Sequence, residues 1–169
     1  SLSPLVFARV QTGATSPRII TLHGYNQRAR DIQHYALAVA PSGYILGLEA
    51  SKGVFEGRTI AGYSWFVGPS DQPAPAFFGA SLSNIERFLL DEIDRQHASR
   101  AELPFLLGVD QGATMALAMA AAVPDLLSGV IAIDGCFPLV PGWRPPLAPL
   151  DRLPVFLIET LPTVSASET

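Results

Sequence analysis

The feature that most constrains the fold is an apolar run that enters a glycine-flanked turn and continues directly into a helix of small residues. The run is Pro104–Val109, the turn is Gly108–Gly112 with Asp110 at its middle, and the helix is predicted over Gly112–Val123. A strand, a tight turn and a helix in this succession are typical of a parallel sheet covered by helices. The middle residue of such a turn is held strained and exposed at the end of its strand.

Further apolar runs predict the remaining strands of this sheet. They are Arg18–His23, Tyr44–Leu48, Leu127–Ile133 and Val155–Glu159. A helical pattern over Arg30–Val39 separates the first two and makes a β-α-β unit. Leu5–Gln11 is predicted to be an edge strand that forms a hairpin with the strand after it. The fold class is therefore α/β, a mostly parallel sheet with helices on both faces.

Residues 49–80 contain many glycines, prolines and serines and no sustained period. This composition predicts one long loop, whose aromatic residues either line a pocket or seal the edge of the sheet. The helix after it is predicted to begin at Ser81 or Ser83, with Glu86 as the capping partner of Ser83, and to run to about His97.

Length and composition indicate one domain and limit the partners. A chain of 169 residues, 49% hydrophobic, suffices for one core. The net charge of −4, without a lysine or arginine cluster, argues against nucleic acid. The longest uncharged apolar stretch, Gln111–Val123, is too short to cross a bilayer. A single cysteine, Cys136, suits a reducing compartment, so we expect a cytoplasmic protein.

Four motifs of this chain resemble those of the carboxylesterase/phospholipase group of α/β-hydrolases, which includes acyl-protein thioesterases. They are Leu22–Gly24, Tyr63–Phe66, Gly108–Ala118 and Ile133–Pro138, and their order and spacing agree across most of the chain. The resemblance implies an α/β-hydrolase fold shortened at its carboxyl end, a small ester-like or acyl ligand and no cofactor. It makes the turn around Asp110 the nucleophile elbow of that fold.

The resemblance also implies an oxyanion hole beside this elbow. Its donors would be the backbone N–H groups of Tyr25 and Gln111, and Gly24 would let the backbone approach the ligand closely. His23 is expected to orient this loop through hydrogen bonds, with a catalytic base as the alternative. Trp65, in the aromatic motif, is expected to contact the substrate.

Three departures from the family predict an impaired serine esterase. Asp110 stands where the nucleophilic serine belongs. The strand Val155–Glu159 is followed by Thr160 and no orienting aspartate. The strand and helix that carry the catalytic histidine in the family would come next, and the sequence ends at Thr169 before them.

An aspartate at the elbow has chemistry of its own. Haloalkane dehalogenases and epoxide hydrolases use one as a nucleophile at carbon, and water activated by histidine then hydrolyses the alkyl-enzyme ester. Asp134, after the fourth core strand, is either the relocated acid of such an enzyme or a cap of its own Gly135 turn. His34 and His97, in or near helices, are expected to be solvated.

Two other hypotheses involve no catalysis. In the first, the pocket keeps its oxyanion hole and binds an ester-like or acidic small molecule, or a partner, without turnover. In the second, the chain is an assembly module that forms a homodimer through the sheet edge after Glu159.

Overall fold

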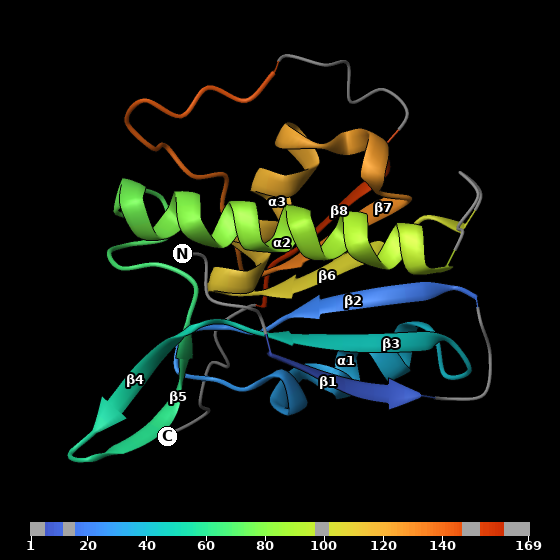
Figure 1. The fold of residues 1–169 in the computed structure, drawn as a ribbon, viewed down its shortest axis with the longest axis horizontal. Helices are drawn as coiled ribbons and strands as arrows, with labels where there is room; N and C mark the ends of the chain where they lie inside the picture. Colours follow the sequence, from blue (N-terminus) through green and yellow to red (C-terminus); the bar gives the residue numbers. More distant parts are fainter. Residues whose placement is uncertain (1–5, 12–15, 97–101, 147–152, 161–169) are drawn as a thin grey trace, which may run out of the picture.

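The computed structural model describes residues 6–11, 16–96, 102–146 and 153–160. A six-stranded sheet with the order β1-β3-β2-β6-β7-β8 forms its centre (Figure 1). All neighbouring pairs are parallel except β1 with β3. The strands are β1 Val6–Gln11, β2 Arg18–Leu22, β3 Tyr44–Glu49, β6 Phe105–Val109, β7 Gly129–Ile133 and β8 Val155–Ile158. The predicted mostly parallel sheet is therefore confirmed.

Helices cover this sheet on both faces, as predicted (Figure 1). The long helix α2 and the small-residue helix α3 pack on one face, and η1 with α1 packs on the other. Their bounds are η1 Ala29–Ile32, α1 Gln33–Val39, α2 Pro75–Gln96, α3 Gln111–Ala122 and η3 Pro124–Leu126. Because β2, β3 and β6 are buried on both faces, their sequences are continuous apolar runs without alternation.

Residues 49–80 do not form the single long loop that their composition predicts. They contain an antiparallel hairpin of β4 (Lys52–Glu56) and β5 (Thr59–Ser64), which projects beyond the main sheet in Figure 1. Most side chains of the hairpin are partly or fully exposed, so no alternation of apolar and polar residues marks its strands.

Helix α2 begins at Pro75, earlier than the predicted start at Ser81 or Ser83. Proline is favoured in the first turn of a helix, where its missing N–H has no partner to lose. Ser81 is buried inside the helix, and its hydroxyl donates to the Trp65 carbonyl. The predicted capping role is therefore wrong, since the serine hydroxyl bonds to another segment.

The amino-terminal strand β1 also pairs differently from the prediction. It lies antiparallel to β3, from Val6 opposite Glu49 to Gln11 opposite Tyr44, and not beside β2. Both edges of β2 are occupied by the parallel strands β3 and β6, which leaves the far edge of β3 for β1.

The opposite edge of the sheet is formed by β8, and its side chains are exposed. All four side chains of β8 are exposed and apolar, although the strand pairs with β7 along its length: Val155, Phe156, Leu157 and Ile158. The predicted homodimer through this edge remains a hypothesis. Among the described residues, no helix combines the length and apolar character needed to cross a membrane.

Candidate functional site

Asp110 occupies the turn between β6 and α3 in a backbone conformation that L residues seldom adopt. Its φ is 52° and its ψ is −117°, and its N–H donates to the Ile133 carbonyl at 2.9 Å. A Cβ at Gly108 would collide with the backbone of Gly112, and one at Gly112 would collide with the Leu22 carbonyl. Strain of this kind persists only where the surrounding structure imposes it, and here the two glycines allow the close contacts that do so.

The Asp110 carboxylate is held by the loop that follows β2. Its Oδ2 accepts a hydrogen bond from the Tyr25 N–H at 2.8 Å. A Cβ at Gly24 would lie 3.1 Å from the Asp110 Cβ and 2.7 Å from Gln27 Oε1, so only glycine fits there without a shift of its neighbours. The Tyr25 N–H, which the resemblance assigns to an oxyanion hole, thus donates its hydrogen bond to the carboxylate of Asp110.

The side chain of Gln111 is buried and clamps the segment after β5. Its Oε1 accepts hydrogen bonds from the Trp65 N–H at 3.0 Å and the Ser64 hydroxyl at 3.1 Å, and its Nε2 donates to the Phe66 carbonyl at 3.2 Å. Its backbone N–H is the first of α3 and has no acceptor within that helix. An oxyanion-donor role for this N–H stays a prediction.

His23 lies behind the elbow with both ring nitrogens in hydrogen bonds. Nε2 accepts from the Ala50 N–H at 3.0 Å, so the proton is on Nδ1, which donates to the Gly24 carbonyl at 2.7 Å. Burial lowers the pKa of His23, partly opposed by the Gly24 hydrogen bond and by the carboxylates of Glu49 and Asp31. The neutral ring therefore has no free nitrogen to take a proton from a ligand.

Trp65 is not among the residues that line the elbow cavity, so the structure gives no support to the expectation that it contacts a substrate. The residue is 1% exposed. Its indole Nε1 donates to the His23 carbonyl at 2.8 Å, and its ring lies 5.2 Å from the His23 ring. A buried tryptophan N–H usually needs a hydrogen-bond acceptor. The His23 carbonyl is that acceptor, and the Trp65 side chain lies in the core beneath the loop that follows β2.

Asp134, at the end of β7, also has a positive φ, 55°, but its carboxylate has other partners. One oxygen accepts from the Thr160 N–H and the other from the Thr160 hydroxyl, both at 2.6 Å. The hydrogen bond from the Thr160 hydroxyl lowers the pKa of Asp134 most, and the bond from the Thr160 N–H lowers it further. The carboxylate therefore ties the end of β7 to the residue that follows β8, and not to the Gly135 turn that was one of its two predicted roles.

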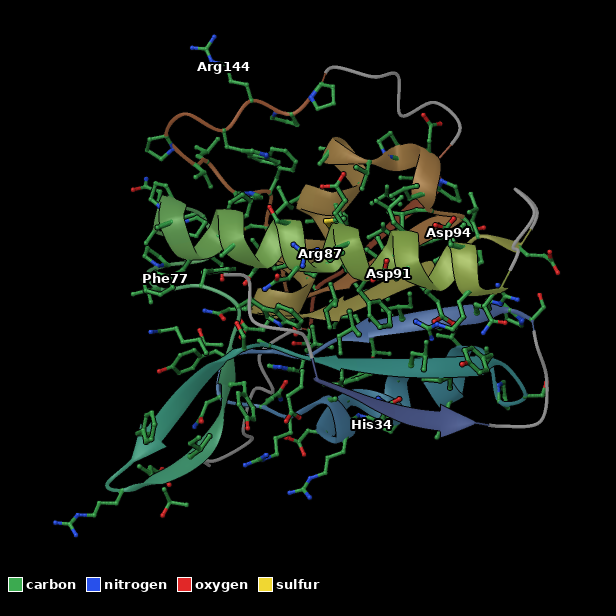
Figure 2. All side chains as sticks on the ribbon, in the orientation of Figure 1. His34, Phe77, Arg87, Asp91, Asp94 and Arg144 are labelled. Carbon is green, nitrogen blue, oxygen red and sulfur yellow. The ribbon has the colours of Figure 1, made fainter. Side chains whose placement is uncertain are left out.

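His34, the other histidine in the described part of the chain, is not among the residues that line the elbow cavity. His34 is exposed on α1, as Figure 2 shows, with its ring against Tyr35 at 4.1 Å. His97 lies outside the described residues. Within those residues, no group of three or more histidine, cysteine, aspartate or glutamate side chains gathers as a metal site.

A cavity of about 680 Å³ opens at the elbow. Asp110 and Gln111 line it from the elbow, Tyr25 from the loop after β2, Lys52 and Val54 from β4, and residues 66–70 from the segment after β5. A cavity of this size accommodates a small molecule. Sequence reasoning missed Lys52 and Val54, because the hairpin that carries them was assigned to a loop.

No protein-family model and no curated protein matches this chain. Solved structures do match it. A carboxylesterase from Bacillus cereus is 19% identical with a TM-score of 0.71, and the match covers 90% of this chain and 69% of that one. A carboxylesterase from Mesorhizobium loti is 15% identical with a TM-score of 0.73, covering 93% and 75%.

A third match is to esterase PE8, 23% identical with a TM-score of 0.68, covering 93% of this chain and 75% of that one. At these identities the likeness establishes the fold and leaves activity to the residues of the site. The strand order, the turn at Asp110 and these matches together show that the chain has the α/β-hydrolase fold of carboxylesterases.

Proposed function

We propose that this chain is an α/β-hydrolase-fold protein that binds a small molecule at its elbow and does not hydrolyse esters by a serine route. The observation that supports this most directly is the hydrogen bond from the Tyr25 N–H to Asp110 Oδ2 at 2.8 Å. An oxyanion hole works by offering its N–H groups to the negative charge that develops on the substrate. Here one of those groups already serves a carboxylate.

The carboxylate also opposes the charge of an ester transition state. A tetrahedral oxyanion that accepted a hydrogen bond from the Tyr25 N–H would lie beside the Asp110 carboxylate. Two negative charges so close together repel each other. Serine-type acyl transfer further requires a hydroxyl nucleophile with a histidine base. Position 110 has no hydroxyl, and both nitrogens of His23 are engaged elsewhere.

One feature favours a second candidate, an aspartate nucleophile. The Tyr25 N–H anchors Oδ2, while Asp110 Oδ1 makes no hydrogen bond with another described residue. Anchoring one oxygen and leaving the other free suits attack on carbon with displacement of a halide or opening of an epoxide. Hydrolysis of the resulting ester needs a histidine-activated water, and neither His23 nor His34 is placed for that among the described residues.

Hydrolysis assays test both candidates. Wild type, Asp110→Ser and Asp110→Asn would be incubated with p-nitrophenyl acetate and butyrate and with a small panel of haloalkanes and epoxides, after circular dichroism confirms that each is folded. We expect no turnover by the wild type. Ester hydrolysis by the wild type would overturn the proposal. Haloalkane or epoxide turnover that Asp110→Asn abolishes would establish the aspartate nucleophile instead.

The Asp110→Ser variant adds one discrimination. If it hydrolyses esters while the wild type is silent, the carboxylate alone blocks the serine route, and a base outside the described residues completes the site. If it is silent too, the base is missing as well. Either result is compatible with the proposal for the wild type, which depends on the wild-type rates.

A further inference from the structure

We propose that the elbow pocket selects a small cation, an ammonium or amidinium group on a short apolar body, and rejects carboxylates. This inference rests on the proposed function, in which the pocket binds a small molecule without ester turnover. It departs from the ester-like or acyl ligand that the family resemblance implies, and the reason is the charge at position 110.

The Asp110 carboxylate at the floor of the pocket is negatively charged and can accept more hydrogen bonds than it receives. A carboxylate accepts about four hydrogen bonds, and that of Asp110 receives one from a described residue, the Tyr25 N–H. No described lysine or arginine lies within salt-bridge distance of it. A ligand with several N–H donors and a positive charge complements this group, and such charge-assisted hydrogen bonds are the strong ones.

Lys52 lines the same cavity but directs its charge to another partner. Its Nζ lies 4.4 Å from the centroid of the Phe77 ring, which is a cation-π contact. Because Lys52 makes no ion pair with Asp110, it leaves the carboxylate free to pair with a ligand. The pocket thus has an anionic floor and a cation at its side.

The remaining walls suit the body of such a ligand. Val54 and Val67 supply apolar surface, and Tyr25, which is 55% exposed, lies at the pocket. Apolar walls with a few convergent polar groups are typical of small-molecule sites. An exposed aromatic ring beside a carboxylate also favours a cationic head group over a neutral one.

The same geometry excludes carboxylate ligands. The Tyr25 N–H, which would bind an anion, is donated to Asp110, so a ligand carboxylate would meet a like charge in place of a donor. Removal of the Asp110 side chain frees this N–H. The Asp110→Ala variant is therefore expected to reverse the preference of the pocket from cations to anions.

Binding of matched probes tests the inference. Benzylammonium, benzyl alcohol and benzoate share an aromatic body and differ in charge, and each would be titrated at pH 7 and low salt by calorimetry and ligand-observed NMR. We expect benzylammonium to bind the wild type about tenfold or more tightly than either other probe. Asp110→Asn, which keeps the shape and removes the charge, should lose about that factor.

Asp134→Asn is the matched control, because Asp134 also follows a strand with a positive φ and does not line the pocket. It should bind benzylammonium as the wild type does. Equal binding of benzylammonium and benzyl alcohol by the wild type would overturn the inference. So would equal losses in the two asparagine variants, or no binding of any probe at millimolar concentration.

The two proposals fail in different measurements. Ester turnover by the wild type overturns the proposed function, whatever the probes do. A wild type that is silent toward esters and shows no preference for the cation overturns the choice of ligand alone. Thermal unfolding of each variant shows whether a lost affinity comes from a lost fold. If Asp110→Asn unfolds, Asp110→Ala with benzoate provides the second measurement, and a gain of benzoate binding supports the inference.

Discussion

Two aspartates at the ends of neighbouring parallel strands have nearly the same φ angle and different surroundings. Asp110 follows β6 with φ 52° and Asp134 follows β7 with φ 55°. The Asp110 carboxylate meets the Tyr25 N–H and lines a cavity of about 680 Å³. Both oxygens of Asp134 are bound by Thr160 at the surface. A position at the end of a strand therefore does not by itself make a residue part of a site. The partners that the neighbouring segment offers to its side chain determine whether that side chain faces a cavity.

The largest effect is expected where the elbow backbone touches its neighbours. In Gly112→Ala the new Cβ would collide with the Leu22 and His23 carbonyl groups. Backbone cannot swing aside as a flexible side chain can, so we expect a loss of about 3 kcal/mol in the free energy of unfolding. Urea denaturation followed by circular dichroism measures it.

Gly79→Ala is the control for this substitution. Gly79 lies within α2, and a Cβ there meets no atom within 4 Å. Alanine in an exposed helix interior should raise the free energy of unfolding by about 0.5–1 kcal/mol. Equal stabilities of the two variants would mean that β2 and α3 are not in close contact at the elbow.

The next effect concerns the buried amide beside Asp110, which has no counterpart beside Asp134. Gln111→Leu keeps the volume but leaves the buried Trp65 N–H without its acceptor, whereas the Phe66 carbonyl still accepts from the Ser64 hydroxyl. A buried donor left unsatisfied should lower the free energy of unfolding by about 1–3 kcal/mol. Urea denaturation checks this against Gln72→Leu, an exposed position where we expect little change.

His23, which follows β2, and Asp134, which follows β7, should also respond to acid in different pH ranges. Burial lowers the pKa of His23 below its ordinary 6.5, so protonation favours the unfolded chain. The stability that His23 contributes is complete above 6.5 and is lost as the pH falls below that value. The hydrogen bonds from Thr160 lower the pKa of Asp134 below its ordinary 3.8, so its contribution is lost only below 3.8.

NMR spectra recorded from pH 7 to pH 3 separate these steps. The Tyr25 amide, in the loop that His23 holds, should begin to shift below pH 6.5, and the Thr160 amide should shift only below 3.8. In His34→Gln, which changes an exposed histidine, the first step should persist. A Thr160 amide that responds first would contradict the assignment of the two steps.

Much of the elbow could be predicted from the sequence, because the physics there is local. The apolar run of β6 must be buried, and the glycines on either side of Asp110 indicate a tight turn. That Tyr25 lies beside Asp110 follows from adjacent parallel strands, whose carboxyl ends meet at one edge of the sheet. The roles proposed for these residues remain predictions until the variants are assayed.

The parts that could not be predicted depend on distant partners. The β4-β5 hairpin is only partly buried and shows no clear alternation, so Lys52 was not placed at the pocket. Trp65 was expected there because it lies in the aromatic motif that the chain shares with the resembled family, yet its indole donates to the His23 carbonyl in the core. The partner of Asp134 is 26 residues away along the chain, a distance at which no local pattern operates.

The smallest effect is expected at the surface bonds of Asp134. Asp134→Asn and Thr160→Val each remove part of the same pair of hydrogen bonds, so the change in the double variant should be smaller than the sum of the two single changes. Because the pair is exposed, global unfolding should hardly change, whereas amide hydrogen exchange at the end of β8 should accelerate. Hydrogen-exchange mass spectrometry of the β8 peptide would measure this, with benzylammonium titrations alongside. If Asp134→Asn changed cation binding as much as Asp110→Asn, the pocket would extend across both strand ends, and the two aspartates would form one site.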